Sequence, residues 1–190
     1  MTQRSIALVT VALAAVVLGL VLFVGLPRLN RRTPARTAVT AIPAAPAPQG
    51  RKIKARLFYV ADDGAHLTSV ERDIAYGETA ADQAREIIAA QIAPVPAPIV
   101  SAVPPGTTLR AVFIADGGNA YVDLSRELAS AHPGGTIDEL LTVYTIVDAL
   151  TVNLPAITAV QVLVDGKEVD TLAGHVDLRR PLIRNLAWVQ

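Results

Sequence analysis

The pattern of apolar and polar positions begins with a long apolar segment near the N-terminus. Residues 6–26 form a run of 21 residues with Thr10 as its one polar member. At 1.5 Å per residue, this run is long enough to cross a hydrocarbon core of about 30 Å. A cleavable signal peptide is the alternative, but its apolar stretch is usually about 7 to 15 residues long and ends in a small-residue cleavage site. We therefore predict a retained transmembrane helix over residues 6–26, after a short tail over residues 1–5.

A spacer follows the apolar run. Residues 27–50 are basic at first and then rich in Ala, Thr and Pro, with four prolines after residue 33. Such a stretch buries too little apolar surface to fold, and its prolines favour an extended polyproline II conformation. We interpret residues 27–50 as a linker and residues 51–190 as the folded domain.

Within residues 51–190, strand patterns occur in pairs. Apolar residues occupy every second position over 52–60 and 107–115, which is typical of a strand with one buried face. The turns Asp116-Gly117 and Asp165-Gly166 predict hairpins, because Gly supplies the positive φ that such turns demand. Further strands are predicted over 70–76, 120–124, 159–164 and 168–172, whereas the tail from residue 174 has no interpretable pattern.

Two helices separate these strand pairs. Thr79 with Asp82 indicates an N-cap for a helix that ends near residue 93, before a proline-rich connection that we interpret as an ordered loop. Thr136 with Glu139 has the spacing of a capping box and predicts a helix to about residue 153. The predicted fold class is α+β: a two-layer sandwich with a mainly antiparallel sheet and two helices packed on one face.

The charge distribution argues against one class of partner and does not decide on which side of the membrane the domain lies. Residues 1–50 carry five Arg and no acidic residue, whereas residues 51–190 carry twelve Lys or Arg and seventeen Asp or Glu, a net charge of minus five. An acidic domain argues against a nucleic-acid partner, since phosphate neutralisation needs a basic surface. Four of the Arg residues follow the predicted span, so the positive-inside rule would leave the domain in the cytoplasm. That orientation stays open beside an extracytoplasmic one.

The sequence contains no recognisable catalytic or cofactor motif. It has no Cys, and its three His residues lack the spacing of a helix-borne metal pair, so they are interpreted as solvated loop residues. No Gly-x-Ser-x-Gly turn presents Ser125 to His132 and Asp138, and no phosphate-binding loop is present. We predict no catalytic residue, metal, cofactor or small-molecule substrate. Dispersed carboxylates such as Asp123, Glu127 and Asp138 keep an envelope hydrolase as the rival class.

Strand alternation also predicts an interaction surface. If the apolar positions of the strands face the helices, their neighbours face away from them. The outward face is basic and partly apolar, with the residues Lys54, Arg56, Arg110, Val112 and Ile114. In an acidic domain, this face is a candidate surface for an acidic partner or a second copy, although a solvated sheet face is the alternative.

The combined pattern resembles the GerMN domain family of sporulation and spore germination proteins. The resemblance covers about residues 53–182 and is carried by Pro104-Pro105-Gly106-Thr107-Thr108-Leu109, Asp116-Gly117, Ala120–Ser125, Val143-Tyr144-Thr145, and Val160–Val164 before Asp165-Gly166-Lys167. It implies a fold similar to the ring-building motifs of envelope assemblies. It also implies a single-pass protein of the cytoplasmic membrane, whose non-enzymatic extracytoplasmic domain binds other envelope proteins or itself. A peptidoglycan- or polysaccharide-binding or hydrolysing envelope protein is the alternative.

Overall fold

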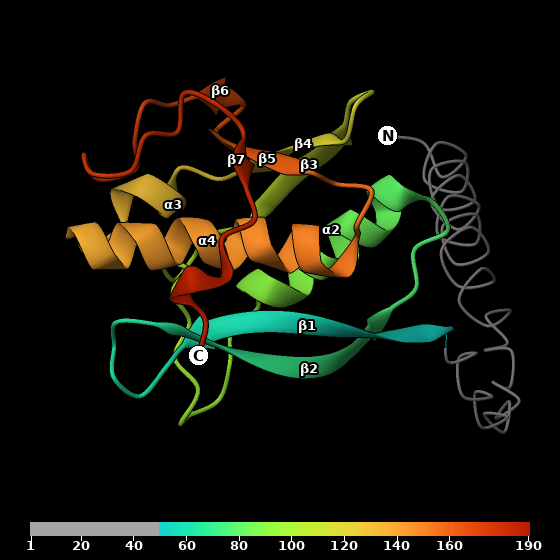
Figure 1. Ribbon diagram of the computed structural model, residues 1–190, viewed down its shortest axis with the longest axis horizontal. Coiled ribbons are helices and arrows are strands. Elements are labelled where there is room, and N and C mark those ends of the chain that lie inside the picture. Colours follow the sequence, from blue (N-terminus) through green and yellow to red (C-terminus); the bar gives the residue numbers. More distant parts are fainter. Residues whose placement is uncertain (1–49) are drawn as a thin grey trace, which may run out of the picture. The chain divides into compact units, whose positions relative to one another are not determined.

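The computed structural model describes residues 50–190, which form an α+β domain (Figure 1). The predicted tail, transmembrane helix and nearly all of the linker lie outside this range. Among residues 50–190, no helix is both long and apolar enough to cross a bilayer. In chain order the elements are β1 (Lys52–Val60), β2 (Leu67–Ala75), α2 (Ala80–Ile92), β3 (Leu109–Ile114), β4 (Asn119–Leu124), α3 (Glu127–Ser130), α4 (Thr136–Asn153), β5 (Ala159–Val164), β6 (Lys167–Glu168), β7 (Leu182–Ile183) and the 3-10 helix η1 (Leu186–Trp188).

The strands form two sheets, which corrects the predicted single sheet. β1 and β2 make an antiparallel hairpin of their own. The second sheet has the order β3-β4-β5-β6, with β7 also paired to β5. Its pairs are antiparallel except β4–β5, which is parallel. This exception follows from the chain path, because the crossover through α4 returns β5 in the direction of β4.

α2 and α4 lie between the two sheets rather than on the outer face of one (Figure 1). Eleven of the 18 residues of α4 are buried, and they occur around the whole helix instead of along one stripe. Leu141, Val143, Val147 and Ala149 are distributed around the helix axis, and all four are buried. Five of the eleven buried residues are polar or charged, so the apolar pattern of the sequence does not reveal that the helix is enclosed on all sides.

A β-bulge inverts the predicted alternation of β3. The pairing of β3 with β4 shifts register between Leu109 and Ala111, and such a shift places one extra residue in the strand. After the bulge, Val112 is buried at 3% exposure, whereas Phe113 is 59% exposed. The prediction that Val112 faces away from the helices is therefore wrong.

The C-terminal tail ties the two sheets together across α4. β7 pairs with β5 of the larger sheet, and the backbone N–H of Asn185 then donates to Asp148 Oδ1 on α4 at 3.0 Å. The chain ends beside the hairpin, where the backbone N–H of Gln190 donates to the carbonyl of Leu67 at 2.8 Å. In Figure 1 this tail is the red segment that crosses α4.

Candidate binding pocket

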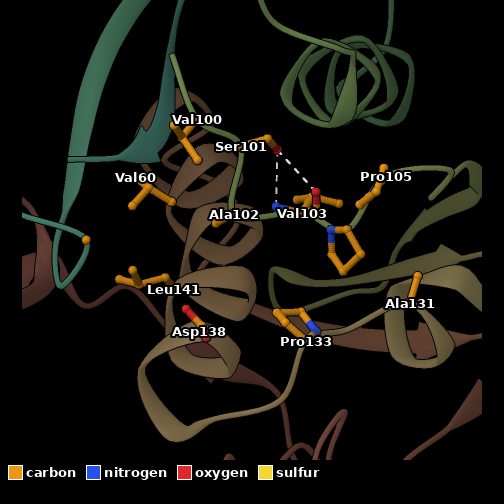
Figure 2. Close-up of a pocket in the computed structure, with 12 residues that line it drawn as sticks. Val60, Val100, Ser101, Ala102, Val103, Pro105, Ala131, Pro133, Asp138 and Leu141 are labelled. Carbon is orange, nitrogen blue, oxygen red and sulfur yellow. Dashed lines mark hydrogen bonds between the residues drawn. The ribbon is translucent and has the colours of Figure 1, made fainter. Parts of the chain in front are cut away.

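A pocket of about 300 Å³ opens where the proline-rich loop meets the first turns of α4 (Figure 2). One wall is the end of β1, the second is the loop, and the third is formed by α4 with the turn before it. The walls are largely aliphatic. The lining residues are Val60, Gly64, Val100, Ser101, Ala102, Val103, Pro104, Pro105, Ala131, Pro133, Asp138 and Leu141.

A second hollow of about 600 Å³ lies against the same loop. It is lined by residues 92–95 and 99–101, together with 103–108, none of which is charged. Five residues of the loop line both cavities, so the loop forms a wall shared by them. Val100 is one of the five and is 55% exposed, which places an aliphatic side chain at the surface between the two hollows.

Hydrogen bonds hold this loop in a defined conformation. The backbone N–H of Val60 donates to the carbonyl of Val100 at 2.9 Å. The Thr142 hydroxyl lies 2.6 Å from the carbonyl oxygen of Ala102 and 2.8 Å from that of Asp138. The loop is therefore fixed to both β1 and α4, and its backbone does not have to be ordered when a ligand binds.

His132 completes this network and is not the freely solvated residue that was predicted. Its Nδ1 accepts from the backbone N–H of Gly134 at 3.0 Å. In the neutral ring the proton is then on Nε2, which donates to the Thr142 hydroxyl at 3.2 Å. Both ring nitrogens are thus used to hold the turn before α4 against the loop.

The residues of the rival catalytic interpretation do not meet in the pocket. Ser125 Oγ accepts from the backbone N–H of Thr108, and His132 is bonded elsewhere. Asp123 is buried beside Arg110, and Glu127 is paired with Arg126. Only Asp138 of the three carboxylates lines the pocket, whereas glycoside hydrolysis normally uses two acting on one bond. Across residues 50–190, no cluster of three His, Cys, Asp or Glu residues could hold a metal.

The predicted interaction surface is not assembled as one face. Lys54 and Arg56 lie on β1, whereas Arg110, Val112 and Ile114 lie on β3 in the other sheet. Val112 is buried, and the bulge in β3 is the physical reason.

The basic residues of that surface also have acidic neighbours, so it is not a basic face. Lys54 Nζ lies 3.4 Å from Asp73 Oδ1. Arg56 lies opposite Glu71 in the pairing of β1 with β2. Arg110 Nε lies 3.0 Å from Asp123 Oδ2, and this contact raises the pKa of the guanidinium.

The sequence indicated parts of this site but did not reveal the pocket. The proline cluster predicted an ordered loop, and Asp138 was among the dispersed carboxylates. The pairing of Val60 with Val100 and the contact of Thr142 with Ala102 each join residues 40 positions apart. A side-chain hydroxyl inside a helical pattern carries no sign of such a partner.

Comparisons with known proteins place this two-sheet α+β domain among the GerMN-type domains. The family model for sporulation and spore germination, named Germane, matches residues 56–170, and the chain belongs to this family. A comparison with curated proteins gave no match.

Solved structures of GerMN domains have a similar fold. The first GerMN domain of the sporulation protein GerM from Bacillus subtilis is 22% identical, with 70% of this chain and 98% of that chain covered, at a TM-score of 0.54. The tandem GerMN domains of the same protein are 19% identical, with 70% and 46% covered, at a TM-score of 0.54. A candidate lipoprotein from Clostridium perfringens is 24% identical, with 73% and 91% covered, at a TM-score of 0.49.

Proposed function

We propose that the chain is a membrane-anchored envelope protein whose residues 51–190 act as a non-enzymatic interaction or assembly module. The observation that carries this proposal is the loop over residues 100–105, which is held by hydrogen bonds and flanked on both sides by apolar hollows. Binding pockets are concave, mostly apolar and largely preformed, with few polar groups. The arrangement suits recognition of a partner better than bond-breaking chemistry.

A non-enzymatic role is supported by where the ionisable groups lie. The pocket has one carboxylate, and the His residue nearest to it uses both ring nitrogens in structural bonds. A general acid–base mechanism needs a group that is free to exchange a proton within reach of the substrate, often with a second such group. The membership of the chain in a sporulation and germination family is consistent with an envelope role.

The anchor proposed for this module is the apolar run over residues 6–26, with the domain on the extracytoplasmic side. The Arg residues after the run favour the opposite orientation, so the topology needs a direct measurement. Protease is added to intact cells, with any outer membrane permeabilised. Digestion of the domain before lysis is expected, whereas protection until lysis would place the domain in the cytoplasm.

Site-specific photo-crosslinking tests the interaction itself. A photoreactive amino acid is placed at Val100 in the full-length chain in its native membrane, and a matched control places it at the exposed Lys167 on β6. The expected result is a protein adduct at position 100 that is weak or missing at position 167. Equal adducts at both positions, or none at position 100, would contradict the proposal. An adduct with glycan strands would favour the peptidoglycan-binding alternative.

A further inference from the structure

The pocket in Figure 2 combines apolar walls with a single charge. Val60, Val100 and Leu141 contribute aliphatic surface, and Asp138 is the one charged residue among those that line it. Within residues 50–190, Asp138 takes part in no ion pair. A lone carboxylate among apolar walls is complementary to a cation carried on an aliphatic chain.

Two acidic residues stand in the first turn of α4, and they differ in their bonding partners. An acidic side chain in the first turn of a helix is stabilising because it opposes the macrodipole. Glu139 is in the same turn, and its carboxylate is buried and bonded to backbone N–H groups of Leu172 and His175. Asp138 is exposed, and its carboxylate takes part in no hydrogen bond within residues 50–190, so it is available to a group from outside the domain.

The hydrogen-bond acceptors of the pocket favour an ammonium over a guanidinium. The carbonyls of Val100 and Ala102 each already accept one hydrogen bond, from the Val60 N–H and the Thr142 hydroxyl. Arg presents five donors in a rigid fork and needs several acceptors, whereas the three donors of Lys can be shared between one carboxylate and water. Its aliphatic stem can pack along apolar walls while its charge stays at the pocket mouth.

The second hollow indicates which kind of side chain lies next to that lysine in the partner. It lies across the shared loop and is lined by uncharged residues. A chain that crosses the loop in an extended conformation would place side chains two residues apart on the two sides of Val100, because every second side chain points to the same face. We infer, on the basis of the proposed interaction function, that the pocket holds a lysine side chain from an extended segment of a partner protein, with an apolar side chain of that segment in the second hollow.

Peptide titration of the full-length chain in detergent tests this inference. The probes are acetyl-Val-Ala-Lys-Ala-Val-amide and the same peptide with norleucine in place of lysine, which keeps the aliphatic chain and removes the charge. Binding is followed by NMR of labelled Ile, Leu and Val methyl groups, with shifts expected at Val60, Val100 and Leu141. The lysine peptide should bind about fivefold more tightly at low salt, as for a partly exposed ion pair.

Two variants identify the carboxylate responsible. Asp138→Asn should abolish the preference for lysine, and the methyl spectrum of the unliganded variant verifies its fold. Asp116→Asn, in the exposed β3–β4 turn, should leave the preference unchanged. Raising the salt concentration should reduce the preference in the unmodified chain but not in Asp138→Asn.

Several results would overturn the inference. These are equal binding of both peptides to the unmodified chain, a lysine preference that persists in Asp138→Asn, or methyl shifts confined to residues outside the two hollows. Tighter binding of a peptidoglycan stem-peptide fragment with a free amine would replace the protein partner with a cell-wall one. The crosslinking at Val100 does not depend on which side chain the partner carries, so it still tests the proposed function after any of these results.

Discussion

The side-chain amide of Gln91 hydrogen-bonds both backbone groups of Phe58, as a neighbouring strand would. The Phe58 N–H donates to Oε1 at 2.9 Å, and Nε2 donates to the Phe58 carbonyl at 2.7 Å. Asn153 on α4 does the same for Arg56, at 2.9 and 2.7 Å. An open strand edge exposes unpaired polar groups, and here two helices supply the missing partners for β1. The helices are thereby attached to the hairpin by directional bonds as well as by packing.

Replacing Gln91 with Leu should destabilise the domain by about 2 kcal/mol, because it leaves the buried backbone N–H of Phe58 without a partner. The Phe58 carbonyl keeps the hydrogen bond from the Thr145 hydroxyl, at 2.6 Å. Gln91 is fully buried, so water cannot replace the lost bonds. Chemical denaturation measures the free energy of unfolding. The control is Arg85→Leu at an exposed position of α2, expected to change it by no more than about 0.5 kcal/mol. A Gln91→Leu variant as stable as the control would show that the amide bonds add nothing.

Asp148 makes the stability of the domain depend on pH. Burial raises the pKa of its carboxyl to about 6, although the backbone N–H of Asn185 and the charge of Arg184 act in the opposite direction. Within the described residues, its Oδ2 is buried without a hydrogen-bond partner. A folded-state pKa above the unfolded value means that the folded state binds the proton more tightly. The stabilisation is complete at a pH below the unfolded pKa and is lost as the pH rises through about 6.

Asp148→Asn should therefore stabilise the domain at pH 7.5 by about 1–2 kcal/mol, because it removes the buried charge and keeps an acceptor for Asn185. The informative measurement is the difference in unfolding free energy between the variant and the unmodified chain from pH 4.5 to 7.5. That difference should increase with pH. A constant difference across this range would mean that Asp148 does not titrate there in the folded state.

The outcome for each helix start shows what local sequence could predict. Thr79 is the N-cap of α2 as predicted, with its hydroxyl accepting from the Asp82 N–H at 3.1 Å. The predicted capping box of α4 is wrong, because its N-cap is Gly135 and Glu139 bonds to a loop 33 residues further along the chain. The same spacing of a Thr and an acidic residue therefore marks a cap at α2 but not at α4, because a distant backbone segment binds the Glu139 carboxylate.

Strand pairing was also predicted only in part. The Asp-Gly turns correctly indicated the hairpins β3–β4 and β5–β6. The separate β1–β2 sheet and the parallel β4–β5 pair depend on where α4 lies, which no local pattern records. The pocket follows from the same placement, since α4 supplies Asp138, Leu141 and the hydroxyl that holds the loop.

Glu139 should stabilise the domain, and replacing it should increase the local opening of the loop whose backbone it binds. Burial tends to raise the pKa of its carboxyl, but backbone N–H donors of residues 172–176 outweigh this and lower it. Glu139→Gln replaces one acceptor oxygen by an amide donor that faces backbone N–H groups, at an expected cost of about 2–3 kcal/mol. Hydrogen exchange should increase at Leu172 and His175. The neighbouring Asp138→Asn is the control, and equal protection of these amides in both variants would contradict this role.

The bulge in β3 gives the last prediction, which compares two adjacent positions. Val112 is buried and Phe113 is exposed, so Val112→Thr should cost about 1–2 kcal/mol for its buried hydroxyl, and Phe113→Thr less than about 1 kcal/mol. Thr is a favourable strand residue, so neither change penalises the strand itself. Without the bulge the order would reverse, because truncating a buried Phe costs about 3–5 kcal/mol. Unfolding free energies of the two variants therefore report directly on which of these side chains faces the buried core on the α2 side.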